Sequence, residues 1–163
     1  MAGEGISRRT AIRRNAREAA LKLLYENAFG VDGGDLTYAA ILESLADHAG
    51  SPVIFEEAER NYIDSIVSGV KNSIPELDER IGKYAIKWTV KRMPIIDLCI
   101  LRMAVWEMLA VNTTPVSVAI NEAVELAKKY GSDKAPPFVN GVLGKVAAGL
   151  NDTAEDTDNR WEK

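Results

Sequence analysis

The sequence predicts an all-α protein, a bundle of seven helices, and three observations support this. Apolar residues recur three and four positions apart through most of the 163 residues, which is the spacing of one helix face. Residues 94–110 are apolar almost throughout, as expected for a helix inside a bundle. Only residues 86–91 alternate apolar and polar as a strand does, and the chain offers no second strand to pair with them. We therefore interpret 86–91 as a connection.

The first part of the chain contains three predicted helices. Apolar residues at helical spacing place these helices at about 8–29, 36–47 and 53–72. Gly30 ends the first, and Gly50-Ser51-Pro52 separates the second from the third. Ser73-Ile74-Pro75-Glu76 then has the pattern of a capping box with proline in the first turn, so a short fourth helix is expected as far as Tyr84.

The fifth predicted helix, 94–110, is the centre of the bundle. Its charges, Asp97, Arg102 and Glu107, stand five residues apart and point in three directions, so the helix has no polar face. Pro94 suits its first turn, where a missing N–H costs nothing. At this length, and with three charges, the segment is too short and too polar to span a bilayer, which takes ~20 mostly apolar residues.

Two helices follow the central one. Thr114-Pro115 is expected to cap the sixth helix and Gly131 to end it. The seventh is predicted at about 138–150, although Phe-Val-Asn-Gly-Val-Leu at 138–143 is also a β-hairpin signal. Because the flanking residues are too few to form useful strands, we predict a helix there.

The predicted organisation is a single domain at 9–150 with a flexible end on each side. Residues 1–8 are expected to be a flexible N-terminal extension. Residues 151–163 are polar and acidic, and we expect a flexible C-terminal tail. Together these boundaries predict one folded body, which is enough chain to bury a core without disulfides.

Charge and cysteine content narrow the class of protein. One cysteine excludes an internal disulfide and a cysteine-based zinc cluster, and with no secretory segment after Met1 a cytoplasmic location is expected. The net charge of −4 argues against a general nucleic-acid coat protein. Yet residues 1–25 carry six basic against two acidic side chains, whereas residues 150–163 carry two against five. A basic arm on an acidic body indicates a local anionic partner.

The enzymatic interpretations are weak. Cys99 stands within the apolar fifth helix and is interpreted as core, and His48 has no second histidine with which to share a metal. Glu122 and Glu125 lie one helical turn apart but lack the Glu-x-x-His motifs of a helical di-metal site. Glu125 also precedes Lys128 by three residues, as on a solvated helix face. We therefore expect no catalytic residue, no metal and no cofactor.

The clustered arginines are the strongest sign of function. Five of them, Arg8, Arg9, Arg13, Arg14 and Arg17, stand on the first predicted helix, with Arg9, Arg13 and Arg17 in one stripe beside its apolar face. Guanidinium groups bind phosphate through two parallel hydrogen bonds and stack on bases. Aromatic residues at or near helix ends, Tyr25, Tyr130 and Phe138, are candidates for stacking on unpaired bases. The alternative is a basic end that only aids solubility.

Four sequence blocks in a fixed order resemble the bacterial NusB family of transcription antitermination factors. They are Arg13-Arg14-Asn15-Ala16-Arg17-Glu18, followed by Ala20, Leu23, Leu24 and Tyr25; Asp97 with Ile100-Leu101-Arg102 and Trp106-Glu107; residues 119–128, AINEAVELAK; and residues 138–143, FVNGVL. The likeness covers roughly Arg9 to Leu150. It implies an all-helical fold of two packed sub-bundles, and it favours helix or loop over strand at 86–91 and 138–143.

The resemblance also implies a function. Members of the family bind boxA RNA of ribosomal leaders together with ribosomal protein S10, also called NusE, as part of the RNA polymerase antitermination complex. Carried over by position, the expected RNA-binding residues are Arg13, Arg14, Arg17, Lys128, Tyr130 and Phe138. The expected S10-binding residues are Tyr25, Asp97 and, more weakly, Glu122.

Two other interpretations stay open. The arginine face is alternatively a protein contact, in an interaction module or a homodimer. The same fold also precedes the catalytic domain of ribosomal RNA cytosine methyltransferases, but this chain contains no cofactor-binding domain. The favoured hypothesis is a non-enzymatic adaptor that binds RNA and S10.

Overall fold

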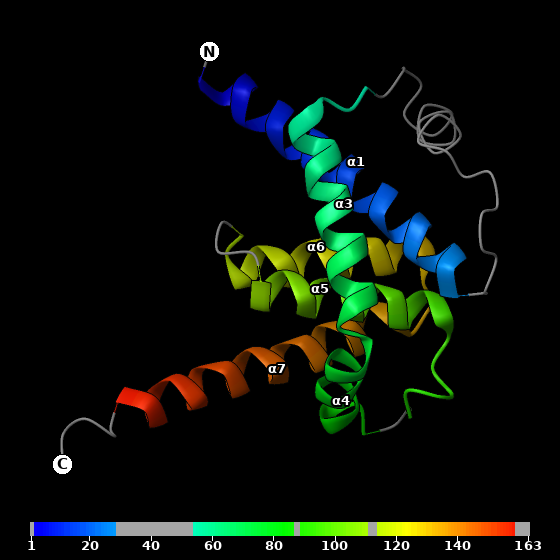
Figure 1. The fold of residues 1–163 in the computed structure, drawn as a ribbon, viewed down its shortest axis with the longest axis vertical. Helices are drawn as coiled ribbons and strands as arrows, with labels where there is room; N and C mark the ends of the chain where they lie inside the picture. Colours follow the sequence, from blue (N-terminus) through cyan, green and yellow to red (C-terminus); the bar gives the residue numbers. More distant parts are fainter. Residues whose placement is uncertain (1, 29–53, 87–88, 111–113, 159–163) are drawn as a thin grey trace. The chain divides into compact units, whose positions relative to one another are not determined.

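The structure is a computed structural model that describes residues 2–28, 54–86, 89–110 and 114–158 (Figure 1). Regular structure in these ranges is entirely helical: α1 Ala2–Ala28, α3 Glu57–Asn72, α4 Ile74–Tyr84, α5 Ile95–Ala110, α6 Val116–Tyr130 and α7 Ala135–Asp158. The all-α prediction is confirmed for this part of the chain, with six helices where seven were predicted. The predicted helix at 36–47 and His48 lie outside the described residues. The chain divides into two compact units, Met1–Asn72 and Ser73–Lys163.

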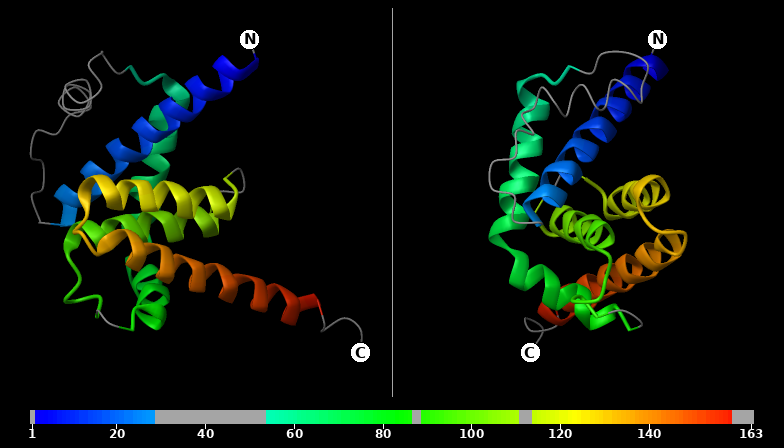
Figure 2. Two further views of the ribbon diagram at one scale, coloured as in Figure 1. Left: turned by 180° about the vertical axis from the view of Figure 1, so that it is seen from behind. Right: turned by 90° about the vertical axis from the view of Figure 1, so that its right-hand side faces the viewer.

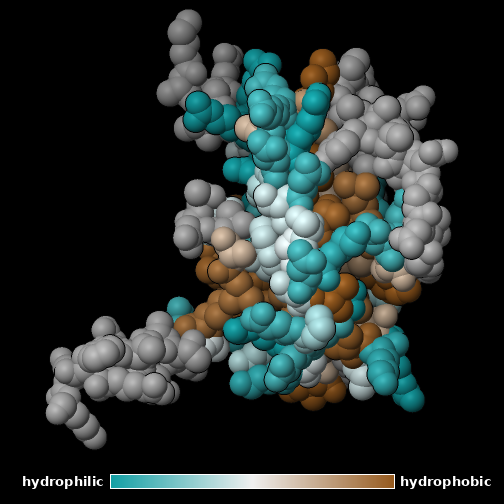
Figure 3. All heavy atoms as spheres, in the orientation of Figure 1, coloured by the Kyte–Doolittle hydropathy of each residue, from teal (hydrophilic) through white to brown (hydrophobic). Residues whose placement is uncertain are grey.

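In the N-terminal unit, α1 crosses and packs against α3 (Figures 1 and 2). Three buried alanines of α1, Ala16, Ala19 and Ala20, keep its buried face small, whereas α3 buries the larger Ile63 and Ile66. Small side chains at a helix contact allow the two axes to approach closely. The visible side of α3 is hydrophilic towards its start and of intermediate hydropathy along its second half (Figure 3), while the helix buries Ile63 and Ile66.

In the C-terminal unit, α5, α6 and α7 lie side by side and α4 packs against α5 and α7 (Figure 2). Helix α5 contacts each of the other three, and nine of its sixteen residues are buried. The prediction of a central helix that is apolar nearly all round is confirmed. Arg102 of α5 donates to both carboxylate oxygens of Asp78 on α4, at 2.7 and 2.8 Å, which gives a two-point ion pair between these helices.

The helix starts differ from the predictions in detail. Pro75 stands in the first turn of α4 as predicted, but the capping box is wrong because the side chain of Ser73 makes no capping hydrogen bond. With φ −122° and ψ 13°, Ser73 lacks the extended backbone of a capping residue. Pro94 precedes α5, and its carbonyl accepts from the Leu98 N–H. Pro115 likewise precedes α6, and Gly131 ends α6 as predicted.

The two ambiguous segments contain no strand in their described residues. Thr89 begins a turn in which its carbonyl accepts from the N–H groups of Arg92 and Met93. The hairpin alternative for 138–143 is wrong, because this segment belongs to α7. Its buried residues recur at helical spacing: Val139, Val142, Leu143 and Val146.

Two helices extend beyond their predicted ends. Helix α1 begins at Ala2, within the predicted N-terminal extension, and α7 continues to Asp158, within the predicted tail. The flexibility of residues 1–8 and 151–163 stays a prediction. Among the described residues, no helix combines the length and apolar character that a bilayer crossing requires.

Candidate nucleic-acid and partner interface

The predicted arginine stripe on α1 divides into exposed and buried members. The side chains of Arg8, Arg9, Arg13 and Arg14 are exposed, as predicted. Arg17 is only 5% exposed, so the predicted stripe of Arg9, Arg13 and Arg17 beside the apolar face is not exposed along its whole length. Arg17 stands four residues before Leu21 and seven before Leu24, both buried, and therefore shares their helix face.

A tyrosine of α3 lies beneath this stripe. The Cζ atom of Arg13 is 3.9 Å from the ring centroid of Tyr62, and that of Arg17 is 5.8 Å from the same centroid. The ring belongs to the core, since Tyr62 is 8% exposed. A guanidinium over the face of an aromatic ring is attracted by the negative charge of that face. Tyr62 therefore links the arginines to the packing of α3, a contact that the helical spacing of apolar residues at 53–72 did not indicate.

The other predicted RNA contacts lie in the C-terminal unit. Lys128 is exposed and pairs with Glu125 at 3.0 Å, as the three-residue spacing predicted. An exposed pair of this kind is weak, so the ammonium exchanges partners readily. Tyr130 is half-buried, with the Lys129 Nζ atom 5.4 Å from its ring centroid. Phe138 is half-buried in the first turns of α7.

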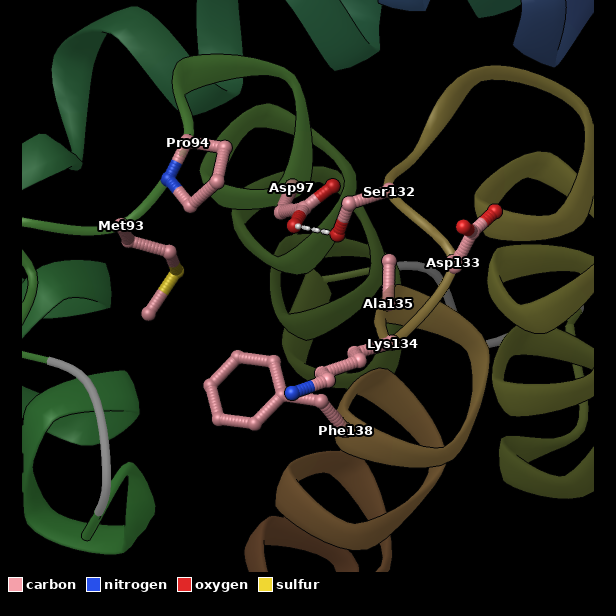
Figure 4. A pocket seen from close by; sticks show the side chains of 8 residues that line it. All are labelled: Met93, Pro94, Asp97, Ser132, Asp133, Lys134, Ala135 and Phe138. Atoms are coloured by element: carbon pink, nitrogen blue, oxygen red, sulfur yellow. Dashed lines mark hydrogen bonds between the residues drawn. The ribbon is translucent and has the colours of Figure 1, made fainter.

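Phe138 also lines a pocket of about 340 Å³ at the start of α5 and α7 (Figure 4). The lining residues are Met93, Pro94, Asp97, Ser132, Asp133, Lys134, Ala135 and Phe138. Figure 4 shows Asp97 of α5 facing Ser132 in the loop between α6 and α7. Four of these eight residues are apolar, and Asp97, Asp133 and Lys134 are charged.

Asp97, one of the expected S10-binding residues, is buried, with 3% of its surface exposed. Its Oδ2 atom accepts a long hydrogen bond of 3.5 Å from the Ser132 hydroxyl, and its Oδ1 atom has no hydrogen-bond partner among the described residues. Burial raises the pKa of Asp97, while the hydroxyl and backbone N–H of Ser132 act in the opposite direction. Within the described ranges, the Oδ1 atom is thus a buried acceptor without a donor, which costs free energy of folding.

Gly131 brings the end of α6 close to this carboxylate. A Cβ atom at Gly131 would lie 2.7 Å from the Ala127 carbonyl oxygen, 2.7 Å from Cβ of Ala135 and 3.0 Å from Asp97 Oδ1. Its φ of −80° suits any residue, so the need for glycine is steric. Gly131 was predicted from the sequence only as the end of a helix, and its close approach to Asp97 has no sequence signal.

The remaining predicted partner residues are separated. Tyr25 is exposed and belongs to the N-terminal unit, whereas Glu122 is buried on α6 of the C-terminal unit and does not line the pocket. Ser132 and Lys134, which line the pocket, were not identified as site residues from sequence. Loop residues without a recurring pattern give no signal before the fold brings α5 and α7 together.

The interpretation of Cys99 as a core residue is confirmed. Its side chain is 2% exposed, and burial raises the pKa of the thiol to about 11, which disfavours the thiolate. In the described ranges, no group of three or more His, Cys, Asp or Glu side chains is arranged to hold a metal ion.

Comparison with known proteins identifies the family. The model of the NusB family matches residues 14–148. The transcription antitermination protein NusB of Natranaerobius thermophilus is 40% identical over 139 residues, which cover 85% of this chain and 96% of that protein. The structure of T. maritima NusB matches with a TM-score of 0.67 and 31% identity, covering 83% of this chain and 90% of the other.

A second solved structure contains the antitermination factors NusB and NusE in complex with dsRNA. It matches with a TM-score of 0.66 and covers 85% of this chain and 98% of the other; at 23% identity, it supports the fold alone. The family match begins at residue 14, so it covers Arg14 and Arg17 of the arginine face together with the central helix α5 and the pocket around Asp97. On this coverage, the chain belongs to the NusB family.

Proposed function

We propose that this chain is a non-enzymatic transcription antitermination factor. In this proposal it binds boxA-type RNA together with ribosomal protein S10 (NusE) and supports ribosomal RNA transcription by the RNA polymerase antitermination complex. Relatives that share 35% to 40% identity with it are named transcription antitermination proteins. Residues 9–150 form the RNA-binding domain in this proposal.

The observation that carries the RNA part is the exposed arginine face of α1. Arg8, Arg9, Arg13 and Arg14 present their side chains to solvent on one helix, and Arg17 adds a buried charge beneath them. Like charges at this density repel one another, and an RNA backbone relieves that repulsion by placing phosphates between them. The planar guanidinium matches two phosphate oxygens at once.

The C-terminal unit carries further proposed RNA-binding residues of its own. Lys128 contributes one exposed ammonium group. Tyr130 and Phe138 are half-buried and offer ring faces to unpaired bases, which stack on aromatic side chains with little sequence preference. Base edges near these rings then supply sequence preference.

The S10 contact in this proposal is centred on the pocket at Asp97. The apolar part of the wall suits the aliphatic stem of a lysine or arginine from a basic partner, and the carboxylates of Asp97 and Asp133 attract its charged head. Such a partly buried pair is screened by salt less than a surface pair. Exposed Tyr25 provides a further contact from the N-terminal unit, and Glu122 a weaker acidic one.

The proposal is tested by measuring RNA binding at several salt concentrations. The purified chain, with S10, is titrated onto a boxA-like RNA, and the logarithm of affinity is expected to fall with a slope of about 0.7 per phosphate neutralised. An affinity that hardly changes with ionic strength would exclude the arginine face as the contact. Footprinting of a leader transcript with both proteins then locates the RNA segment.

Mass measurement in solution separates this function from the interaction-module alternative. The chain is measured with and without RNA. A complex that gains the mass of RNA agrees with the proposal. A stable dimer that excludes RNA would instead assign the arginine face to a protein contact.

A further inference from the structure

We propose that Tyr62 is a positioning residue for RNA binding: its ring holds Arg13 and Arg17 in the arrangement that receives a phosphate. This inference rests on the proposed RNA-binding function and adds to it a residue on α3, outside the arginine-rich segment. The aromatic face of Tyr62 orders the two arginines, and Tyr62 does not itself contact RNA.

The geometry at the ring supports this role. Arg13 lies 3.9 Å from the ring centroid, which is close stacking, and Arg17 lies 5.8 Å from it, near the outer limit for a cation and a ring. The two guanidinium groups therefore share one ring. Arg13 is exposed, so its N–H donors stay accessible at the edge of the stacked plane, whereas Arg17 is buried.

The ring is well suited to fix a flexible cation. Tyr62 is 8% exposed and is followed on α3 by the fully buried Ile63 and Ile66, so core packing holds its orientation. An arginine in water samples many rotamers, and binding must order it at a cost in affinity. Stacking on a fixed ring orders Arg13 before RNA arrives, which removes part of that cost.

The charged groups around Arg13 do not replace the ring. Arg9 and Arg14 on α1 and Arg60 on α3 are exposed cations, which repel Arg13. Glu59 of α3 accepts a hydrogen bond from the Glu56 N–H at the start of that helix. Within the described ranges Arg13 forms no ion pair, and the group that it contacts is the aromatic face of Tyr62.

The test compares Tyr62→Phe, which keeps the ring, with Tyr62→Leu, which keeps an apolar side chain and removes the π face. RNA affinity is measured on the full chain with S10 present. Tyr62→Phe is expected to stay within about twofold of the parent, and Tyr62→Leu to lose about fivefold, as for freeing one or two ordered side chains. Ile66→Val, a core change one turn away, is the control for packing loss and is expected to leave affinity unchanged.

A double-mutant cycle with Arg13→Ala assigns the effect to the arginine. In the Arg13→Ala background the penalty of Tyr62→Leu is expected to shrink to about twofold, because only Arg17 still contacts the ring. An equal penalty in both backgrounds would overturn the inference, since Tyr62 would then act independently of Arg13.

The NMR signal of Arg13 tests the stack on Tyr62 without any substitution. In the parent protein the NMR signal of the Arg13 Nε–H is expected to be shifted by the ring current of Tyr62; a signal at the position of a solvated arginine overturns the stack even if Tyr62→Leu fails to fold. If Arg13→Ala leaves RNA binding intact, the proposed function fails at this surface. If Arg13→Ala weakens RNA binding while Tyr62→Leu leaves it unchanged or strengthens it, the positioning role of Tyr62 is wrong and the proposed RNA-binding function stands.

Discussion

The arginine face of α1 and the pocket at Asp97 differ in how far their charged groups are exposed to water. On α1, four arginines are exposed, and the buried ring of Tyr62 lies against the guanidinium group of Arg13. At the pocket, a single carboxylate is withdrawn from water with one oxygen lacking a donor. Exposed charges act by number and are screened by salt, whereas a buried charge acts through desolvation and is screened little. We therefore expect RNA binding to be salt-sensitive and the contribution of Asp97 to be salt-insensitive.

The largest effect is expected when the arginines of α1 are replaced. The triple variant Arg13→Ala, Arg14→Ala, Arg17→Ala is expected to weaken boxA-like RNA binding by about 100-fold and to lower the salt slope by about 1.4, at ~0.7 for each phosphate contact of the two exposed arginines. The measurement is RNA affinity against salt concentration. Arg80→Ala, which removes an exposed arginine of α4 from its pair with Glu76, is the control. Unchanged affinity in the triple variant would contradict the RNA-binding proposal.

The next largest effect is expected at Gly131, where the end of α6 approaches Asp97. Gly131→Ala is expected to destabilise the protein by about 2 kcal/mol, because its Cβ meets a backbone oxygen and the Cβ of Ala135 at 2.7 Å. Gly141→Ala is the matched control: a Cβ there meets nothing within 4 Å. Since Gly141 is inside α7, that variant should be stabilised by about 0.5–1 kcal/mol. Urea denaturation of both variants measures the difference, and equal stabilities would refute the steric argument.

The buried carboxylate itself predicts a dependence on pH. Because burial raises the pKa of Asp97, the native state keeps its proton to a higher pH than the unfolded chain. Stability therefore falls as pH rises from the ordinary value of 3.8 through the raised native pKa, and the loss is complete above it. Asp97→Asn mimics the neutral form, so it should be more stable than the parent at pH 7 and equal to it at acid pH, as measured by thermal unfolding.

The same substitution separates stability from partner binding. Asp97→Asn is expected to weaken S10 binding about tenfold by removing a desolvated charge, even as the fold becomes more stable. Asp133→Asn, which removes an exposed charge at the same pocket, is the control and should have a small effect that salt abolishes. Loss of S10 binding in both variants to the same extent would show that net charge, not the buried carboxylate, is what S10 recognises.

The smallest effect concerns the exposed lysine of α6. Lys128→Ala is expected to weaken RNA binding about threefold and to lower the salt slope by ~0.7, the contribution of one phosphate contact. Its pair with Glu125 contributes little to stability, so the unfolding midpoint should not change. A change in stability without a change in RNA affinity would assign Lys128 to the fold.

Sequence periodicity determined most of the helical framework. The central helix α5 was recognised because its charges occupy no common face, and α4 because proline in the first turn marks a helix start. The four NusB-like blocks were also visible in the chain, since residue order is all that a family resemblance requires. These properties are local, and neighbouring residues are sufficient to specify them.

Tertiary packing decided the surroundings of the charged residues. The sequence contains Arg13 and Arg17 in one stripe, yet only the packing of α3 against α1 exposes the first, buries the second and places Tyr62 beside both. Asp97 likewise became a buried pocket residue because the loop at Ser132 closes over the start of α5. The physical reason is that solvation depends on atoms distant in sequence, whereas helix formation depends on hydrogen bonds four residues apart.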